Sequence, residues 1–191
     1  MKALIPFIFC LALGAASTIQ AQQTVVVNGQ ALAPQTMQQL EAYYQVKIQP
    51  GRYWYDPYCG LWGMEGGPAR GGMMAGLALG GQMRANISRG QTRIFINGRQ
   101  IPQSERVQWE QLTGPITPGR YWLDAYGNVG LEGGPSLGNL IALAQQVQYN
   151  ASGYNRGNGN TFYRNFYTGT GSGSSSEGFY IMGEDWSYSS F

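Results

Sequence analysis

The amino-acid sequence predicts an α+β fold made of two internally repeated ββαββ-like units with short helices, plus a Gly/Ser/Tyr-rich C-terminal hairpin or tail. The first observation is a duplicated motif: residues 50–68 read PGRYWYDPYCGLWGMEGGP and residues 118–135 read PGRYWLDAYGNVGLEGGP, about 68 residues apart. A strand-like run ending in Asn-Gly precedes each copy, and the composition changes to Asn, Gly, Ser and Tyr near residue 150. The predicted segments are a signal peptide (1–21), repeat unit 1 (22–90), repeat unit 2 (91–149) and a C-terminal segment (150–191).

Each unit is predicted to begin with a tight hairpin followed by a short helix. Residues 25–29 (VVVNG) and 94–98 (IFING) are β-branched or aromatic runs that end in Asn-Gly, the strongest short hairpin signal. A proline follows each hairpin, and proline is tolerated in the first turn of a helix. We therefore expect helices from Pro34 to Gln45 and from Pro102 to Thr113.

The GRYW segment of each copy alternates its side chains between two faces and predicts a second hairpin. We expect a register in which Trp54 lies opposite Met64 and Trp122 lies opposite Leu131. Residues 136–147 show a broad apolar face at helical spacing and predict a further helix.

The N-terminal residues are typical of a secretory signal peptide. Lys2 supplies the positive start, an apolar run without charge covers residues 3–16, and small residues precede a cleavage point near Ala21. The run is too short to span a bilayer, which takes about 20 residues. We expect a secreted or periplasmic protein without a membrane span.

Composition argues against several classes of function. The chain has 12 Lys and Arg against 10 Asp and Glu, and Lys2 is removed with the signal peptide. The remaining basic residues are scattered, so nucleic-acid binding is not expected. The absence of histidine removes the usual general base of Ser and Cys hydrolases and the commonest transition-metal ligand. Cys59 stands alone after cleavage, so no internal disulfide forms. We assign no catalytic residue, metal or cofactor.

A cation, an indole and a carboxylate share one strand face in each copy. Such a row binds a polar ring, for example a sugar, by stacking and hydrogen bonds. The competing interpretation is structural: the arginines pair with Glu65 and Glu132, and the tryptophans belong to the scaffold. The candidate ligand-binding residues are Arg52, Trp54 and Asp56 in the first copy and Arg120, Trp122 and Asp124 in the second.

Two further interpretations involve the acidic residues. Asp56 with Glu65, or Asp124 with Glu132, would serve as the carboxylate pair of a glycosidase if the carboxyls lie roughly 5–10 Å apart. Asp124, Asn128 and Glu132 hint at a calcium loop, although the sequence lacks the glycine and the second acidic position of an EF-hand.

The repeated pattern N-G, P-G-R-Y-W-x-D and E-G-G-P resembles a group of uncharacterised secreted bacterial proteins, over roughly residues 24–147. This resemblance implies a family and no particular activity. The sequence favours an exported, non-enzymatic envelope or extracellular protein with a binding or structural role. Its partner would be a cell-wall or extracellular polysaccharide, or another envelope protein. The alternative is a small carbohydrate- or peptidoglycan-acting hydrolase that uses Asp and Glu.

Overall fold

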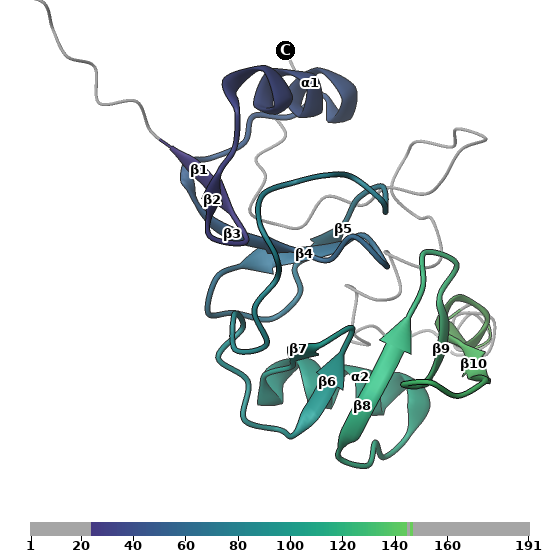
Figure 1. Cartoon of the computed structure of the whole chain (residues 1–191). Coiled ribbons are helices and arrows are strands. Elements are labelled where there is room, and N and C mark those ends of the chain that lie inside the picture. The colour runs from purple at the N-terminus through teal and green to yellow at the C-terminus, as the bar shows by residue number, and fades with distance from the viewer. Residues whose placement is uncertain (1–23, 145, 147–191) are drawn as a thin grey trace, which may run out of the picture.

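The computed structural model describes residues 24–144 and 146 of the 191-residue chain, which form two five-stranded sheets and short helices, an α+β arrangement (Figure 1). The first sheet contains β1 (Val25–Val27), β2 (Gln30–Ala31), β3 (Gly51–Tyr55), β4 (Leu61–Met64) and β5 (Gly71–Gly72). The second contains β6 (Ile94–Ile96), β7 (Arg99–Gln100), β8 (Gly119–Leu123), β9 (Asn128–Leu131) and β10 (Ser136–Asn139). The labelled helices are α1 (Pro34–Tyr44) and α2 (Gln103–Thr113), and a further helical segment begins at Leu140.

The two sheets have the same strand order and the same pairing. The orders are β2-β1-β3-β4-β5 and, read in the same sense, β7-β6-β8-β9-β10. β1 runs parallel to β3 with Val26 opposite Arg52, and β6 runs parallel to β8 with Phe95 opposite Arg120. Parallel neighbours need a crossover connection, and α1 and α2 provide it.

Each Asn-Gly turn also attaches its hairpin to the end of the neighbouring parallel strand. Asn28 and Asn97 have positive φ angles of 50° and 48°, and the glycine after each is also positive, as a type I′ turn requires. The Asn28 side chain accepts from the Tyr55 N–H at 3.0 Å and donates to the Tyr55 carbonyl at 2.8 Å. Asn97 makes the same pair of bonds with Leu123, at 2.9 and 2.8 Å.

The predicted register of the GRYW hairpins is wrong by one residue. Trp54 lies opposite Gly63, and Trp122 lies opposite Gly130. The reason is the space that each indole occupies over its partner strand: a Cβ at position 63 would lie 2.8 Å from Trp54 Cζ2, and one at position 130 would lie 2.7 Å from the same atom of Trp122. Only glycine fits there, so the indole selects the register.

The two predicted crossover helices are confirmed, and each boundary agrees within one residue. The predicted helix over residues 136–147 is wrong at its start. Residues 136–139 form β10, which pairs with β9, and the chain is helical from Leu140. Asn139 begins this helix, because its Oδ1 accepts from the Ala142 N–H at 3.0 Å, as an N-cap does.

The first sheet is covered on both faces. One face packs against α1, which Figure 1 shows on the side away from the second sheet. The other face carries Trp54 and Leu61, both fully buried in a cluster that includes Trp109 of α2 and Leu123 of β8. The cluster on the α1 side contains Val25, Val27, Ile48, Tyr53, Tyr55, Trp62 and Leu79.

No helix in the part of the chain that the structure describes is long and apolar enough to cross a membrane. The predicted signal peptide (1–21) and C-terminal segment (150–191) lie outside the described residues.

Candidate functional site

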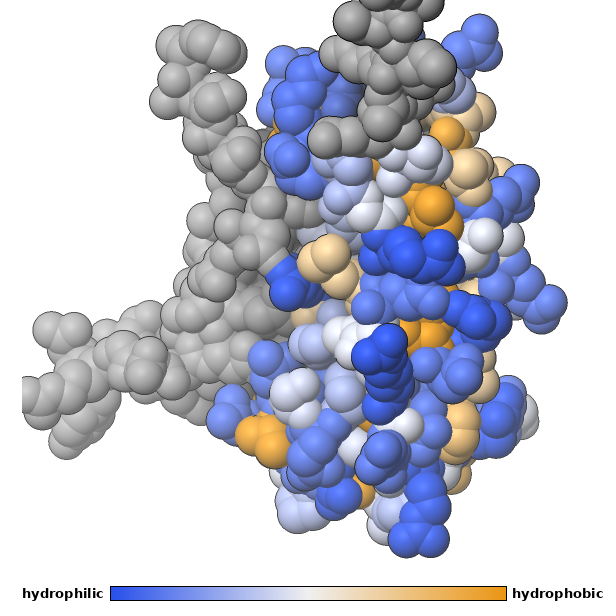
Figure 2. All heavy atoms as spheres, turned by 90° about the vertical axis from the view of Figure 1, so that its left-hand side faces the viewer, coloured by the Kyte–Doolittle hydropathy of each residue, from blue (hydrophilic) through white to orange (hydrophobic). Residues whose placement is uncertain are grey.

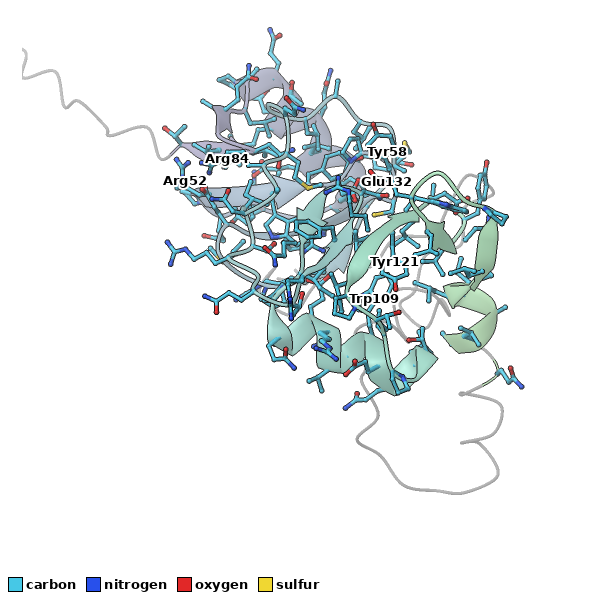
Figure 3. All side chains as sticks on the ribbon, turned by 60° about the horizontal axis from the view of Figure 1, so that its bottom comes forward. Arg52, Tyr58, Arg84, Trp109, Tyr121 and Glu132 are labelled. Carbon is cyan, nitrogen blue, oxygen red and sulfur yellow. The ribbon has the colours of Figure 1, made fainter. Side chains whose placement is uncertain are left out.

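Both arginines of the duplicated row pair with the predicted glutamates. Arg52 Nε lies 2.7 Å from Glu65 Oε2, and Arg84 adds a second bond to Glu65 at 2.5 Å. Figure 3 shows Arg52 and Arg84 on the same side of the first sheet. Arg120 pairs with Glu132 in the same way in the second sheet. The side chains of Arg52 and Arg120 are 58% and 53% exposed, so these are surface ion pairs.

Trp54 is part of the scaffold and cannot stack on a ligand, because its exposed fraction is 0%. Its indole lies over Gly63 and donates to the Gly67 carbonyl at 3.2 Å. The guanidinium carbon of Arg99 lies 3.9 Å from the ring centroid on a side chain that is itself buried. The first sheet therefore offers no open indole to a ligand.

Asp56 closes the first GRYW hairpin from a buried position. Its carboxylate accepts from the Tyr58 N–H at 2.9 Å, from Asn97 Nδ2 at 2.8 Å and from Cys59 Sγ at 3.2 Å. Burial raises the pKa of Asp56, and its hydrogen bonds oppose that rise. Because Asn97 comes from the other half of the chain, Asp56 also connects the two sheets.

Trp122 repeats the local geometry of Trp54 but stays half-buried. Its indole lies over Gly130 and donates to the Gly134 carbonyl at 3.1 Å. Within the described residues no guanidinium lies over this ring; Arg120 instead lies 5.3 Å from the ring of Phe95. We call the surface formed by Phe95, Arg120, Trp122, Asp124 and Glu132 the Trp122 face.

Asp124 is occupied by its own loop. It accepts from the backbone N–H groups of Tyr126 and Asn128, at 2.9 and 2.8 Å, and from Asn128 Nδ2 at 2.9 Å. Glu132, the third member of the calcium hypothesis, pairs with Arg120. No group of three metal-ligating side chains occurs among the residues that the structure describes.

The carboxylate pairs are separated by the length of a strand. The Glu65 N–H bonds the Arg52 carbonyl, so Glu65 lies opposite Arg52, four residues from Asp56. At about 3.3 Å per residue the backbones of the two acids are about 13 Å apart. Glu132 lies opposite Arg120 in the same way, four residues from Asp124.

Sequence reasoning missed Arg99 and Glu105. Both are at most 1% exposed, and they form two hydrogen bonds, of 2.9 and 2.6 Å. Glu105 also accepts from the Ala69 N–H at 2.9 Å, so the pair joins the two halves of the chain. The sequence offered one signal for this pair. The second half has charged residues at Arg99 and Glu105, where the first half has the uncharged Gln30 and Thr36.

Other surfaces offer less chemistry. A cavity of about 320 Å³ lies beside α2, where Figure 3 shows Trp109 and Tyr121 close together, but its lining contains no charged side chain. The face drawn in Figure 2 is mostly hydrophilic, and its apolar residues appear in narrow spots between polar ones. The Trp122 face is therefore the strongest candidate site among the described residues.

No family model matches the chain, and no solved structure matches it. Two proteins of Arabidopsis thaliana are similar to part of it. Extra-large guanine nucleotide-binding protein 1 is 34% identical over 113 residues, and extra-large guanine nucleotide-binding protein 2 is 30% identical over 113 residues. Each match covers 57% of this chain and 13% of the relative. The chain thus spans about an eighth of the length of these curated relatives.

Proposed function

We propose that this chain is an exported, non-enzymatic binding protein, and that its Trp122 face docks another protein of the envelope or the extracellular space. One observation carries the proposal. The face around Trp54 is a docking surface for the second half of the chain, and the Trp122 face has the same construction but is open within the described residues.

The proposal treats residues 22–90 and 91–149 as two copies of one unit. The shared strand order, the shared register and the paired Asn, Trp and Gly contacts support this interpretation. The match to the two plant proteins extends over 113 residues, more than the repeat spacing of about 68 residues. A stretch longer than one unit therefore recurs inside much longer chains, as expected for an interaction module.

Export remains a proposal from the N-terminal sequence, and the burial of the remaining thiol is compatible with it. Cys59 is buried and donates to Asp56, and burial raises the pKa of its thiol. Because the thiolate is the species that oxidises, this cysteine should stay reduced in an oxidising compartment. We expect mass spectrometry of exported material to show a chain that begins near Gln22; an intact Met1 on exported protein would contradict the assignment.

The alternative hydrolase has less support. A glycosidase needs carboxyls about 5–10 Å apart, whereas these strands place the backbones of the two acids about 13 Å apart, and the carboxylates are engaged in ion pairs or loop hydrogen bonds. The guanine nucleotide binding named for the plant relatives is not proposed here either. The only lysines are Lys2 and Lys47, and neither follows a phosphate-binding glycine loop.

Photo-crosslinking in intact producing cells tests the docking surface. A photoreactive amino acid replaces Arg120 on the Trp122 face or, as a control, the exposed Val107 on α2. We expect a discrete protein adduct from position 120, none from position 107, and loss of the adduct when Trp122→Ala is added. The same adducts from both positions would refute the docking surface, and an adduct whose added mass is removed by glycosidases would assign the face to a polysaccharide.

A further inference from the structure

At the junction between the two halves of the chain, an arginine of the second half covers the indole of Trp54 in the first half. Arg99 directly follows the Asn97-Gly98 turn, on the β6–β7 hairpin that Figure 1 shows below the first sheet. Its guanidinium lies over Trp54, with the carbon 3.9 Å from the ring centroid. Glu105, in the first turn of α2, balances the charge through two hydrogen bonds.

The Trp122 face repeats the local geometry of the Trp54 surface on which Arg99 lies. The indole lies over a glycine and donates to a glycine carbonyl, and Arg120, two residues earlier on β8, pairs with Glu132 just after β9. Asp124 lies two residues after Trp122, as Asp56 lies two residues after Trp54. The Trp122 face therefore has the aromatic ring on which a guanidinium stacks, with the Asp124 carboxylate on the same strand face, and the described residues place no guanidinium over that ring.

The first hairpin and α1 of a second copy of this chain could not cover Trp122 in the way that Arg99 and Glu105 cover Trp54. Its first hairpin carries Gln30 where the second carries Arg99, and α1 carries Thr36 where α2 carries Glu105. A neutral amide and a hydroxyl cannot replace a buried guanidinium–carboxylate pair. The expected occupant is therefore a different chain.

We propose that the Trp122 face binds a partner protein that presents an arginine directly after a tight β-turn, with a carboxylate of the same partner beside that arginine. This inference rests on the proposed function and adds the chemistry of the partner to it. The arginine stacks on the outer face of Trp122, and Asp124 adds a second negative charge nearby.

The missing half can be built into the chain itself. The full mature chain with Gln30→Arg and Thr36→Glu presents the arginine on its first hairpin and the carboxylate on α1. Because this contact is head-to-tail and does not close, we expect open chains whose length grows with concentration in sedimentation velocity. The parent protein should keep its own sedimentation behaviour. Gln30→Lys with Thr36→Glu is the matched control, because lysine keeps the charge but lacks the planar guanidinium.

Adding Trp122→Ala to the arginine variant should weaken the association about 10- to 30-fold, as the loss of about 2 kcal/mol requires. The proposal is overturned if the folded arginine variant does not associate, if the association survives Trp122→Ala, or if the lysine control associates equally well. It is also overturned if association requires deletion of residues 150–191, because the chain's own segment would then be the occupant.

A second measurement uses a small probe on the unmodified mature chain. Argininamide should shift the indole N–H resonance of Trp122, which the Trp122→Phe variant assigns, and should leave that of Trp54 unchanged, since Arg99 already covers it. The uncharged analogue citrullinamide should shift neither. A shift produced by a chitin oligosaccharide and not by argininamide would overturn the proposal. Both measurements use purified protein, so they can fail or succeed independently of the crosslinking in cells.

Discussion

Trp54→Ala and Trp122→Ala form a matched pair of substitutions, because the two residues have the same local geometry and differ in what covers them. Each indole lies over a glycine and donates to a glycine carbonyl. Trp54 is fully buried beneath Arg99, whereas Trp122 is half-buried without a described cation. The difference in unfolding free energy between the two variants therefore measures what burial beneath Arg99 and the second half of the chain contributes.

Emptying a large core aromatic costs about 3–5 kcal/mol of unfolding free energy, and we expect Trp54→Ala to lie in this range. The same change leaves Arg99 without its aromatic partner, a further cost of up to about 2 kcal/mol. Trp122 keeps part of its surface in water and lacks that cation, so Trp122→Ala should cost about 1–3 kcal/mol. The expected difference is about 2 kcal/mol or more, with Trp54→Ala the more destabilising.

Urea unfolding followed by far-UV circular dichroism measures both variants against the parent. The unfolding free energy must fall with urea concentration at the same slope in all three proteins before their midpoints are compared. A changed slope would mean that the unfolded or folded ensemble differs. Equal destabilisation by the two substitutions, or a larger effect at Trp122, would refute the reasoning and show that Trp122 is covered as Trp54 is.

Three further predictions concern the same junction. Gly63→Ala should destabilise the fold by about 1–3 kcal/mol in urea melts, because the new Cβ would lie 2.3 Å from a backbone oxygen; a neutral effect would contradict the packing. Arg99→Met should cost about 3–5 kcal/mol by leaving Glu105 buried without its cation, and adding Glu105→Leu should recover much of that loss; a double variant as unstable as the single would contradict the pairing. Burial raises the pKa of Asp56, so between the ordinary value of 3.8 and the raised value the folded state binds more protons than the unfolded one. The contribution of Asp56 to stability should therefore rise as the pH falls through that window, so the difference in stability between the parent and Asp56→Asn should change in the parent's favour in melts measured across it; a constant difference would contradict the assignment.

The parts of the fold that local chemistry determines could be predicted from the sequence. The Asn-Gly pairs require positive φ at two successive residues, and the prolines mark where α1 and α2 begin, so the turns and both helices could be located. The start of the third helix was missed because pairing with β9 extends residues 136–139 against their helical pattern. Tertiary pairing overrides a local periodicity of this kind.

The hairpin register and the junction depend on contacts that one segment does not reveal. Aromatic–aliphatic pairing predicted the wrong partners for both tryptophans, although a glycine two residues before each glutamate was the available signal. Arg99 and Glu105 act across the two halves, so neither their burial nor their role follows from their own neighbourhood. The ligand row was identified as a group, but the structure buries Trp54 and Asp56 and leaves Trp122 and Asp124 half-buried, with both arginines exposed.

The residue differences around the Trp122 face fit the proposal that this face stays hydrated until a partner binds. Leu61, fully buried beside Trp54, is replaced by Asn128, which lies opposite Asp124 on the second hairpin. Ala69, buried against Glu105, is replaced by the exposed Ser136. An apolar version of this face would be a permanent interface or an aggregation site. A polar border around a half-buried indole suits reversible binding instead, in which the ring and a guanidinium supply the central contact and the rim stays hydrated.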